Sequence, residues 1–409
     1  MTVPSGDDVA VSAPVGEPAV VMPVCPSCQS QVSSGERFCE ACGADLGPEP
    51  AAAGTADAGD IPEPAVAPDA ASGTPAPHAA PDAAPDAAPD AAPAACHECG
   101  GEVADDGYCT QCGAAAVSAR NHFTEQPAPW VAAVCDRGIR HVRNEDAVAI
   151  AAGPDPGTHA VLVVCDGVSS STDSDVASLA AARAARDVLA AVPRPNSTDG
   201  VGTRVAASTK ALVAATDAAN DAVIANTTTG PGNPASCTFV AAVLDGVDLT
   251  VGWVGDSRAY WLPDTGAPRL LTVDDSFAAE QIANGMPRAE AESGPQAHAI
   301  TRWLGIDAPD HTPRTVSLDL DGPGWLLVCS DGLWNYCSEA QDIAALVAES
   351  SRSAGSAGAE PLSLAGALVD WANAQGGQDN ITVALARVAA PGTPDATARS
   401  TQPIAVSSP

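Results

Sequence analysis

Acidic side chains stand at the ends of apolar segments in several widely separated parts of this chain. Asp166 directly follows the apolar run 161–165, and Asp331 follows the run 325–330. Because an Asp at the mouth of a buried strand has few rotamers, it is held rigidly, as a site for a hard cation requires. The full set of candidate acidic ligands is Glu145, Asp146, Asp166, Asp256, Asp331 and Asp379.

The residue types in this set indicate which metal they would bind. Carboxylates and water favour Mg²⁺ or Mn²⁺, whereas Zn²⁺ prefers nitrogen and sulfur. Gly167 and Gly332 follow two of the acids and let the backbone turn sharply, which brings a carbonyl oxygen towards the same cavity. One Asp-Gly pair is usually an ordinary turn. Several such motifs in one chain, three of them ending strands, favour a magnesium or manganese site.

A second kind of metal chemistry is carried by the cysteines, eight of which form four CxxC pairs before residue 113. A CxxC turn places two thiolates at adjacent tetrahedral positions, and two such turns complete a four-thiolate zinc site. All four positions would be filled by protein, so each site would be structural and would supply most of the folding free energy of its small unit. We predict two zinc ribbons, each with one Zn²⁺, rather than redox pairs. Their ligands are Cys25, Cys28, Cys39 and Cys42 in the first and Cys96, Cys99, Cys109 and Cys112 in the second.

Composition divides the chain into six parts. The expected parts are a disordered leader at 1–24, a zinc ribbon at 25–47, a linker rich in Ala, Pro and Asp at 48–95, a second ribbon at 96–114, a large domain at 128–388 and a disordered tail at 389–409. The linker has no aromatic residue and no Lys or Arg, so it cannot bury enough apolar surface to offset its ordering entropy.

The large domain shows both strand and helix patterns. Strands are expected at 161–165, 325–330 and 381–388, and the segment 237–254 reads as a hairpin with Asp245-Gly246 at its turn. Ala- and Leu-rich helices are expected at 175–192, 203–225 and 361–374. Antiparallel hairpins separated by long helices predict an α+β fold.

The charge of the chain limits its partners. Its 409 residues include 51 acidic and 18 basic residues, a formal net charge of -33. Nucleic-acid binding depends on clustered Lys and Arg that release counterions, so a nucleic-acid partner is not expected, and neither is an anionic membrane. The first residues lack the basic and apolar segments of an export signal, so the expected location is cytoplasmic.

Taken in order, the acidic motifs resemble the metal-dependent Ser/Thr protein phosphatase 2C family. The motifs are Asn-Glu-Asp at 144–146, Asp-Gly at 166–167, Gly-Asp-Ser-Arg at 255–258, Ser-Asp-Gly-Leu-Trp at 330–334 and Gly-Gln-Asp-Asn-Ile-Thr at 377–382. The resemblance implies a four-layer αββα sandwich, in which helices flank two antiparallel sheets and a dinuclear Mn²⁺ or Mg²⁺ centre lies between the sheets. It also implies phosphoprotein substrates of Ser/Thr protein kinases. Independently of the resemblance, we expect the zinc ribbons to bind a protein partner and to recruit or regulate.

The resemblance also assigns roles to individual residues. Asp166 corresponds to the carboxylate that bridges both metals, and the carbonyl of Gly167 to a ligand of one of them. Asp331 and Asp379 correspond to further ligands of the first metal, and Glu145 to a ligand of the second, largely through water. The remaining assignments are Asp146 as the hydrogen-bonded neighbour of Glu145, Asp256 as a ligand of a weaker third ion, and Asn380 as the residue that orients the Asp379 loop.

The chain departs from the family pattern at the substrate phosphate. His141 stands where most members have a phosphate-binding Arg, with Arg140 and Arg143 on either side. We expect His141, Arg143 and Asp146 to be the catalytic residues, with His141 binding phosphate when protonated. Val168 stands where many relatives have His or Met, and Asp275 stands where His is more usual. The alternative is a catalytically weak or inactive metal-binding scaffold of the same fold.

Overall fold

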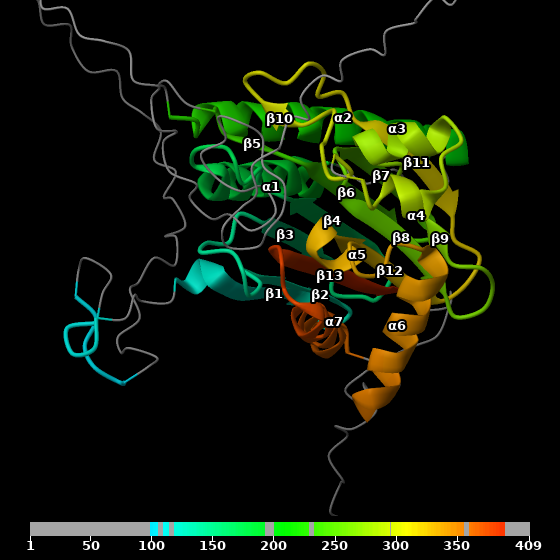
Figure 1. Cartoon of the computed structure of the whole chain (residues 1–409). Helices are drawn as coiled ribbons and strands as arrows, with labels where there is room; N and C mark the ends of the chain where they lie inside the picture. The colour runs from blue at the N-terminus through cyan, green and yellow to red at the C-terminus, as the bar shows by residue number, and fades with distance from the viewer. Residues whose placement is uncertain are drawn as a thin grey trace, which may run out of the picture. The chain divides into compact units, whose positions relative to one another are not determined.

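The computed structural model describes residues 99–104, 109–113, 118–192, 200–228, 233–294, 296–355 and 360–388. Most of these residues form two antiparallel sheets with helices on both outer faces (Figure 1). In the described residues, no helix has the length and apolar character needed to cross a membrane.

One sheet has five strands and the other has six. The order in the five-stranded sheet is β11 (Arg314–Asp319), β7 (Asp248–Val254), β6 (Phe239–Asp245), β4 (His159–Cys165) and β3 (Ala147–Ala152). The order in the six-stranded sheet is β1 (His122–Ala128), β2 (Val131–Asp136), β13 (Ile381–Val388), β12 (Gly324–Cys329), β8 (Arg258–Pro263) and β9 (Arg269–Leu270). A short pair joins β10 (Leu304–Gly305) to β5 (Ser236–Cys237), and all neighbouring strands run antiparallel.

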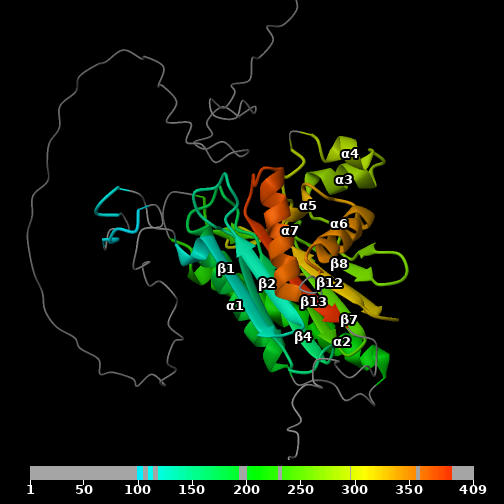
Figure 2. The same ribbon diagram turned by 90° about the horizontal axis from the view of Figure 1, so that it is seen from below.

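The helices cover the two sheets from opposite sides. α1 (Ser174–Ala191) and α2 (Val201–Ala225) pack on the five-stranded sheet, while α6 (Ala340–Ser353) and α7 (Pro361–Gln375) pack on the six-stranded sheet (Figure 2). The shorter helices are η1 (Ala119–Asn121), α3 (Phe277–Ala283), α4 (Arg288–Ala291) and α5 (Asp331–Trp334). The predicted arrangement of two antiparallel sheets flanked by helices is therefore confirmed.

The burial pattern of each strand follows from its place in these layers. Every residue of β12 is buried because the strand has a sheet neighbour on each side and is covered on both faces, which explains its continuous apolar sequence. The edge strand β11 alternates exposed and half-buried positions over part of its length. Side chains of both sheets meet in one apolar core, represented by Leu162 and Leu326, and each helix layer closes a further core against its own sheet.

The strands and helices expected from sequence are present with small shifts in their ends. The hairpin of β6 and β7 turns at Gly246, whose φ of 66° lies in the left-handed region that Gly adopts readily. Helix α7 begins with Pro361 and ends at Gln375, with Gly376 as its C-terminal cap. Sequence reasoning did not anticipate α6 or the strand β1, and β1 begins at His122, ahead of residue 128 where the large domain was expected to start.

Candidate active site

Five Asp residues reach one region because each follows or precedes a strand of the two central sheets. Asp166 follows β4, and Asp331 opens α5 one residue after β12 ends. Asp146 immediately precedes β3, and Asp379 lies two residues before β13. Asp256 lies in the turn between β7 and β8. These carboxylates come from distant parts of the chain and lie in one region because the strand ends of both sheets meet there.

The carboxyl groups are close enough to change each other's protonation. Those of Asp146 and Asp331 both lie near the carboxyl group of Asp166. Burial raises the pKa of Asp146 to about 6, and burial together with the Asp146 charge raises the pKa of Asp331 to about 6 as well. The pKa values of Asp166 and Asp256 are raised well above the usual range by burial and by neighbouring carboxylates. A cation between these groups would remove the repulsion.

Two buried oxygens in the cluster accept no hydrogen bond from the part of the chain that the structure describes. Asp146 Oδ2 accepts hydrogen bonds from Ser330 Oγ at 2.6 Å and Thr382 Oγ1 at 2.7 Å, and Asp331 Oδ2 accepts one from Asn335 Nδ2 at 2.8 Å. Their partner oxygens, Asp146 Oδ1 and Asp331 Oδ1, accept none from the described residues. Since buried carboxylate oxygens are costly unless they are hydrogen-bonded or bind a metal, this donor set fits divalent cations.

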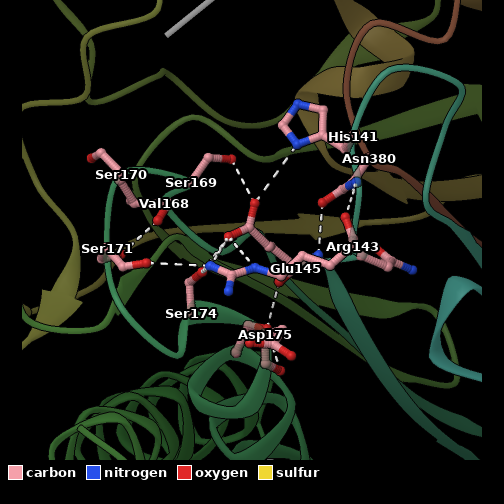
Figure 3. A network of polar contacts seen from close by, with 12 residues as sticks. His141, Arg143, Glu145, Val168, Ser169, Ser170, Ser171, Ser174, Asp175 and Asn380 are labelled. Carbon is pink, nitrogen blue, oxygen red and sulfur yellow. Dashed lines mark hydrogen bonds and ion pairs between the residues drawn. The ribbon is translucent and has the colours of Figure 1, made fainter. Parts of the chain in front are cut away.

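Glu145 differs from the five Asp residues because protein donors already compensate its charge (Figure 3). Oε1 accepts hydrogen bonds from Arg143 Nη2 at 2.7 Å and Ser174 Oγ at 2.5 Å, and Oε2 accepts one from Ser169 Oγ at 2.7 Å. Burial alone would raise the pKa of Glu145, but hydrogen bonds from His141, Ser174, Arg143 and Ser169 lower it to about 2. Glu145 is therefore anionic without any metal.

His141 lies between two carboxylates. Its Nδ1 is 3.7 Å from Glu145 Oε2 and its Nε2 is 3.3 Å from Asp379 Oδ1, and only 11% of the side chain is exposed. Burial disfavours the protonated ring, but the hydrogen bond with Glu145 and the charge of Asp379 outweigh it and raise the pKa of His141. When it is protonated, His141 therefore shares its charge between two protein carboxylates.

Arg143 is a cation at the site whose side chain stays partly exposed. Its side chain is 44% exposed even though Nε and Nη2 both donate to Glu145 Oε1. Nη2 also lies 3.3 Å from Ser174 Oγ and 3.4 Å from the Ser171 carbonyl oxygen. The guanidinium is therefore held in one orientation at the edge of the site.

Asn380 joins the loop that carries Glu145 to the loop that carries Asp379. Its Oδ1 accepts a hydrogen bond from the Glu145 backbone N–H at 2.7 Å, and its Nδ2 donates to the carbonyl oxygens of Arg137 at 2.7 Å and Arg143 at 3.1 Å. The two loops approach closely at Gly138, where a Cβ would lie 2.1 Å from the Asp379 carbonyl oxygen. Any other residue at 138 would separate them.

The turn that carries Asp256 is fixed by neighbouring ion pairs. Gly255 N–H donates to Asp275 Oδ2 at 3.2 Å, and Asp275 is paired with Arg302 at 3.2 Å and Arg314 at 2.7 Å. Asp275, which stands where many relatives have His, therefore supports this turn. Arg258 is 1% exposed, binds Asp274 and lies 3.5 Å from the centre of the Trp334 ring in α5, so it connects the Asp256 turn to the helix of Asp331.

Several supporting residues were given no role by sequence reasoning. Ser330 and Thr382 belong to motifs that the sequence singles out, and their hydroxyls donate to Asp146. Ser169 and Ser174 follow the Asp-Gly motif and bind Glu145. The serine-rich segment 169–174 was the visible signal for these two contacts, but it does not indicate which carboxylate they reach.

Three of the eight predicted zinc ligands are described, and they lie together. The sulfur atoms of Cys99, Cys109 and Cys112 all fall within 4.8 Å of one another, with 3.5 Å between those of Cys99 and Cys109. Backbone N–H groups of Cys112 and Gln111 lower the pKa of Cys109 to about 6, which favours the thiolate that zinc requires. The other predicted ligands, Cys25, Cys28, Cys39, Cys42 and Cys96, lie outside the described residues.

Comparison with known proteins places this site in a family. Residues 138–371 match the family model of protein phosphatase 2C, which is more than half of the chain. The chain belongs to the protein phosphatase 2C family. This membership confirms the predicted activity, that of a Mn²⁺/Mg²⁺-dependent serine/threonine protein phosphatase. Residues 24–46 match the model of a zinc-ribbon domain, which supports one ribbon.

Individual family members resemble the chain over most of their own length. The serine/threonine phosphatase stp of Listeria monocytogenes is 28% identical over 256 residues, covering 61% of this chain and 92% of that protein. The solved serine/threonine phosphatase of S. agalactiae covers 65% of this chain and 100% of its own, with 24% identity and a TM-score of 0.50. The Mycobacterium tuberculosis phosphatase PstP/Ppp covers 63% and 98% respectively, with 27% identity and a TM-score of 0.49.

The raised carboxyl pKa values predict how Mn²⁺ stabilises the domain at different pH. Acids with a pKa of about 6 in the folded chain contribute stability that is complete below about pH 3.8 and is lost as the pH rises through 6. Mn²⁺ at about 100 times its dissociation constant should therefore raise the melting temperature by about 5–10 °C at pH 7.5, and by clearly less at pH 5. Differential scanning fluorimetry measures both shifts.

The control for this measurement is Asp331→Asn, which removes one carboxylate from the cluster. Its Mn²⁺-induced shift at pH 7.5 should be smaller than that of the unmodified chain. Equal shifts at the two pH values in the unmodified chain would contradict the repulsion among these carboxylates.

Proposed function

We propose that this phosphatase hydrolyses phosphoserine and phosphothreonine at the junction of the two sheets, with divalent ions held by the acidic cluster. The observation that carries the proposal is the pair of buried, donorless oxygens on Asp146 and Asp331, both beside Asp166. Groups so placed are stable only as acids or as metal ligands. The proposed ligand set is Glu145, Asp146, Asp166, the carbonyl of Gly167, Asp256, Asp331 and Asp379.

The proposed ligands fall into two groups, according to whether hydrogen-bond donors of the protein compensate their negative charge. Asp166, Asp331 and Asp379 belong to the crowded group and would bind the ions directly, with Asp256 contributing to a weaker third ion. Glu145 is compensated by Arg143 and serine hydroxyls, which supports a ligand acting through water. When bound there, two Mn²⁺ or Mg²⁺ ions would lower the pKa of a water molecule and neutralise charge on the phosphoryl group.

The chain's own groups hold the substrate and exclude a covalent route. Arg143 would offer its exposed edge to phosphoryl oxygens, while His141, when protonated, would hold Glu145 and Asp379 in place. Cys165 and Cys329 adjoin the acidic motifs, but both are fully buried and burial raises their thiol pKa values, so neither serves as a nucleophile. With Val168 after the Asp-Gly motif, the proton for the leaving alkoxide comes from water.

We propose that the zinc ribbons, outside the catalytic domain, recruit a protein partner. We propose that the catalytic domain runs from 118 to 388, since η1 and β1 belong to its fold. The clustered sulfur atoms of Cys99, Cys109 and Cys112 support a second ribbon at 96–114 beside the first at 25–47, each with one structural zinc. The ribbons would bind a protein partner, with 1–24, 48–95 and 389–409 as leader, linker and tail. The substrates would be phosphoproteins made by Ser/Thr protein kinases.

The first test of this proposal is hydrolysis of an aryl phosphate and of a phosphothreonine peptide with and without Mn²⁺. The full chain should hydrolyse both only when the divalent ion is present. Asp331→Asn should lower kcat/KM at least about 100-fold, because it removes a carboxylate that binds metal directly. Asp370→Asn, at an exposed position on α7, is the matched control and should leave kcat/KM within about twofold.

The same assay can also contradict catalysis. Folded protein that shows no Mn²⁺-dependent hydrolysis at any pH from 5 to 9 would contradict the proposal. The non-catalytic metal-binding scaffold would then be the better interpretation.

The second test counts zinc. The full chain should contain two zinc ions per molecule by elemental analysis, and Cys109→Ser combined with Cys112→Ser should leave one. Cys337→Ser, at a half-buried position in the catalytic domain, is the control and should retain two. A single zinc in the unmodified chain, or two in the double variant, would contradict a ribbon at 96–114.

A further inference from the structure

A basic loop borders the candidate active site of this very acidic chain. Residues 137–143 hold three of the 18 basic residues of the chain, Arg137, Arg140 and Arg143, together with His141. The loop leads directly into Glu145 and Asp146. Because the net charge of -33 repels anionic peptides in general, a local basic segment at this position favours their approach to the site alone.

The loop is fixed to the turn that carries Asp379. The backbone N–H groups of Ile139 and Arg140 both donate to the Gly377 carbonyl oxygen, at 2.9 and 3.0 Å. Gly377 has a φ of 50°, and a Cβ there would lie 2.8 Å from the Ile139 nitrogen. Arg137 Nη1 also donates to the His141 carbonyl oxygen at 2.5 Å. A side chain projecting from this loop is therefore presented at a defined position relative to the acidic cluster.

The three arginines differ in what their side chains bind. Arg143 is paired with Glu145, and Arg137 binds the backbone of its own loop. Arg140 is exposed, and its guanidinium makes no ion pair or hydrogen bond with any described residue. Its neighbours Ile139 and Val142 are 58% and 89% exposed. The exposed part of the loop thus combines one uncommitted cation with two apolar side chains.

We infer that Arg140 is a specificity-determining residue, which binds a second anionic group of the substrate beside the scissile phosphoryl group. The inference rests on the proposed function. Arg140 and Arg143 are three residues apart, so their Cα atoms are separated by at most about 10 Å. The second anion would therefore lie about one to three residues from the phosphorylated residue in an extended peptide. A carboxylate and a second phosphate share this chemistry.

The experiment compares four substrates. Three are phosphothreonine peptides of one sequence with a neutral residue, a Glu or a second phosphothreonine two positions away, and the fourth is an aryl phosphate. The unmodified chain should prefer either anionic peptide to the neutral one, because Arg140 binds the added charge. Arg140→Ala should reduce that preference in kcat/KM about two- to fivefold, through KM, and leave the aryl phosphate unchanged.

Two further variants separate binding from structural effects. Arg140→Lys keeps the charge and should retain part of the preference. Arg269→Ala removes an exposed arginine on the edge strand β9 and should leave the preference unchanged. Raising the salt concentration should weaken the preference of the unmodified chain more than that of Arg140→Ala.

Three results would overturn the inference. An unchanged preference in Arg140→Ala would remove the role of Arg140. A fall in kcat on the aryl phosphate in that variant would assign Arg140 to the scissile phosphoryl group instead of a second anion. If the unmodified chain hydrolysed no aryl phosphate with Mn²⁺, the proposed function itself would fail and this inference with it.

Discussion

Repulsion among buried carboxylates is the constraint on which the rest of the site depends. The carboxyl group of Asp166 lies near those of both Asp146 and Asp331, and burial raises the pKa of each of the three. An arrangement of this kind destabilises a folded chain near neutral pH unless a cation compensates it. Glu145 shows the contrast, since Arg143 and serine hydroxyls compensate its charge and lower its pKa to about 2. This contrast supports the proposal that the acidic cluster binds ions directly and that Glu145 acts through water.

The scaffold holds these groups together through strand ends and polar links. Each of the two sheets is closed by apolar packing on both faces, so the ends of β4, β12 and β13 cannot move apart easily. Asn380 then ties the Glu145 loop to the Asp379 loop through three hydrogen bonds. Arg258, packed on Trp334, connects the Asp256 turn to α5. The energy of the large apolar cores thus holds together an arrangement of charges that would otherwise separate.

Sequence reasoning predicted the parts of this site that depend on local pattern. Asp166 and Asp331 were recognisable because an acid after an apolar strand has a fixed position. The other candidate acids came from similar motifs, and the resemblance supplied the role expected of each. The compensation of Glu145 could not be predicted, because Ser169, Ser174 and Arg143 reach it only through tertiary packing. The pairing of His141 with both Glu145 and Asp379 could not be predicted either, because these residues also meet only through tertiary packing. Helix α6 was missed because its 14 residues carry a mixed sequence with only three buried positions.

The most direct measurement of the central claim is the number of Mn²⁺ ions bound at equilibrium, determined by titration followed with electron paramagnetic resonance. Thiolate sites select zinc over manganese, so the zinc ribbons should not contribute to this count. We expect two tightly bound Mn²⁺ ions per chain at pH 7.5, and fewer in Asp166→Asn, which removes the carboxylate near both Asp146 and Asp331. A chain that binds no Mn²⁺, or an Asp166→Asn variant that binds as many ions as the unmodified chain, would contradict this expectation.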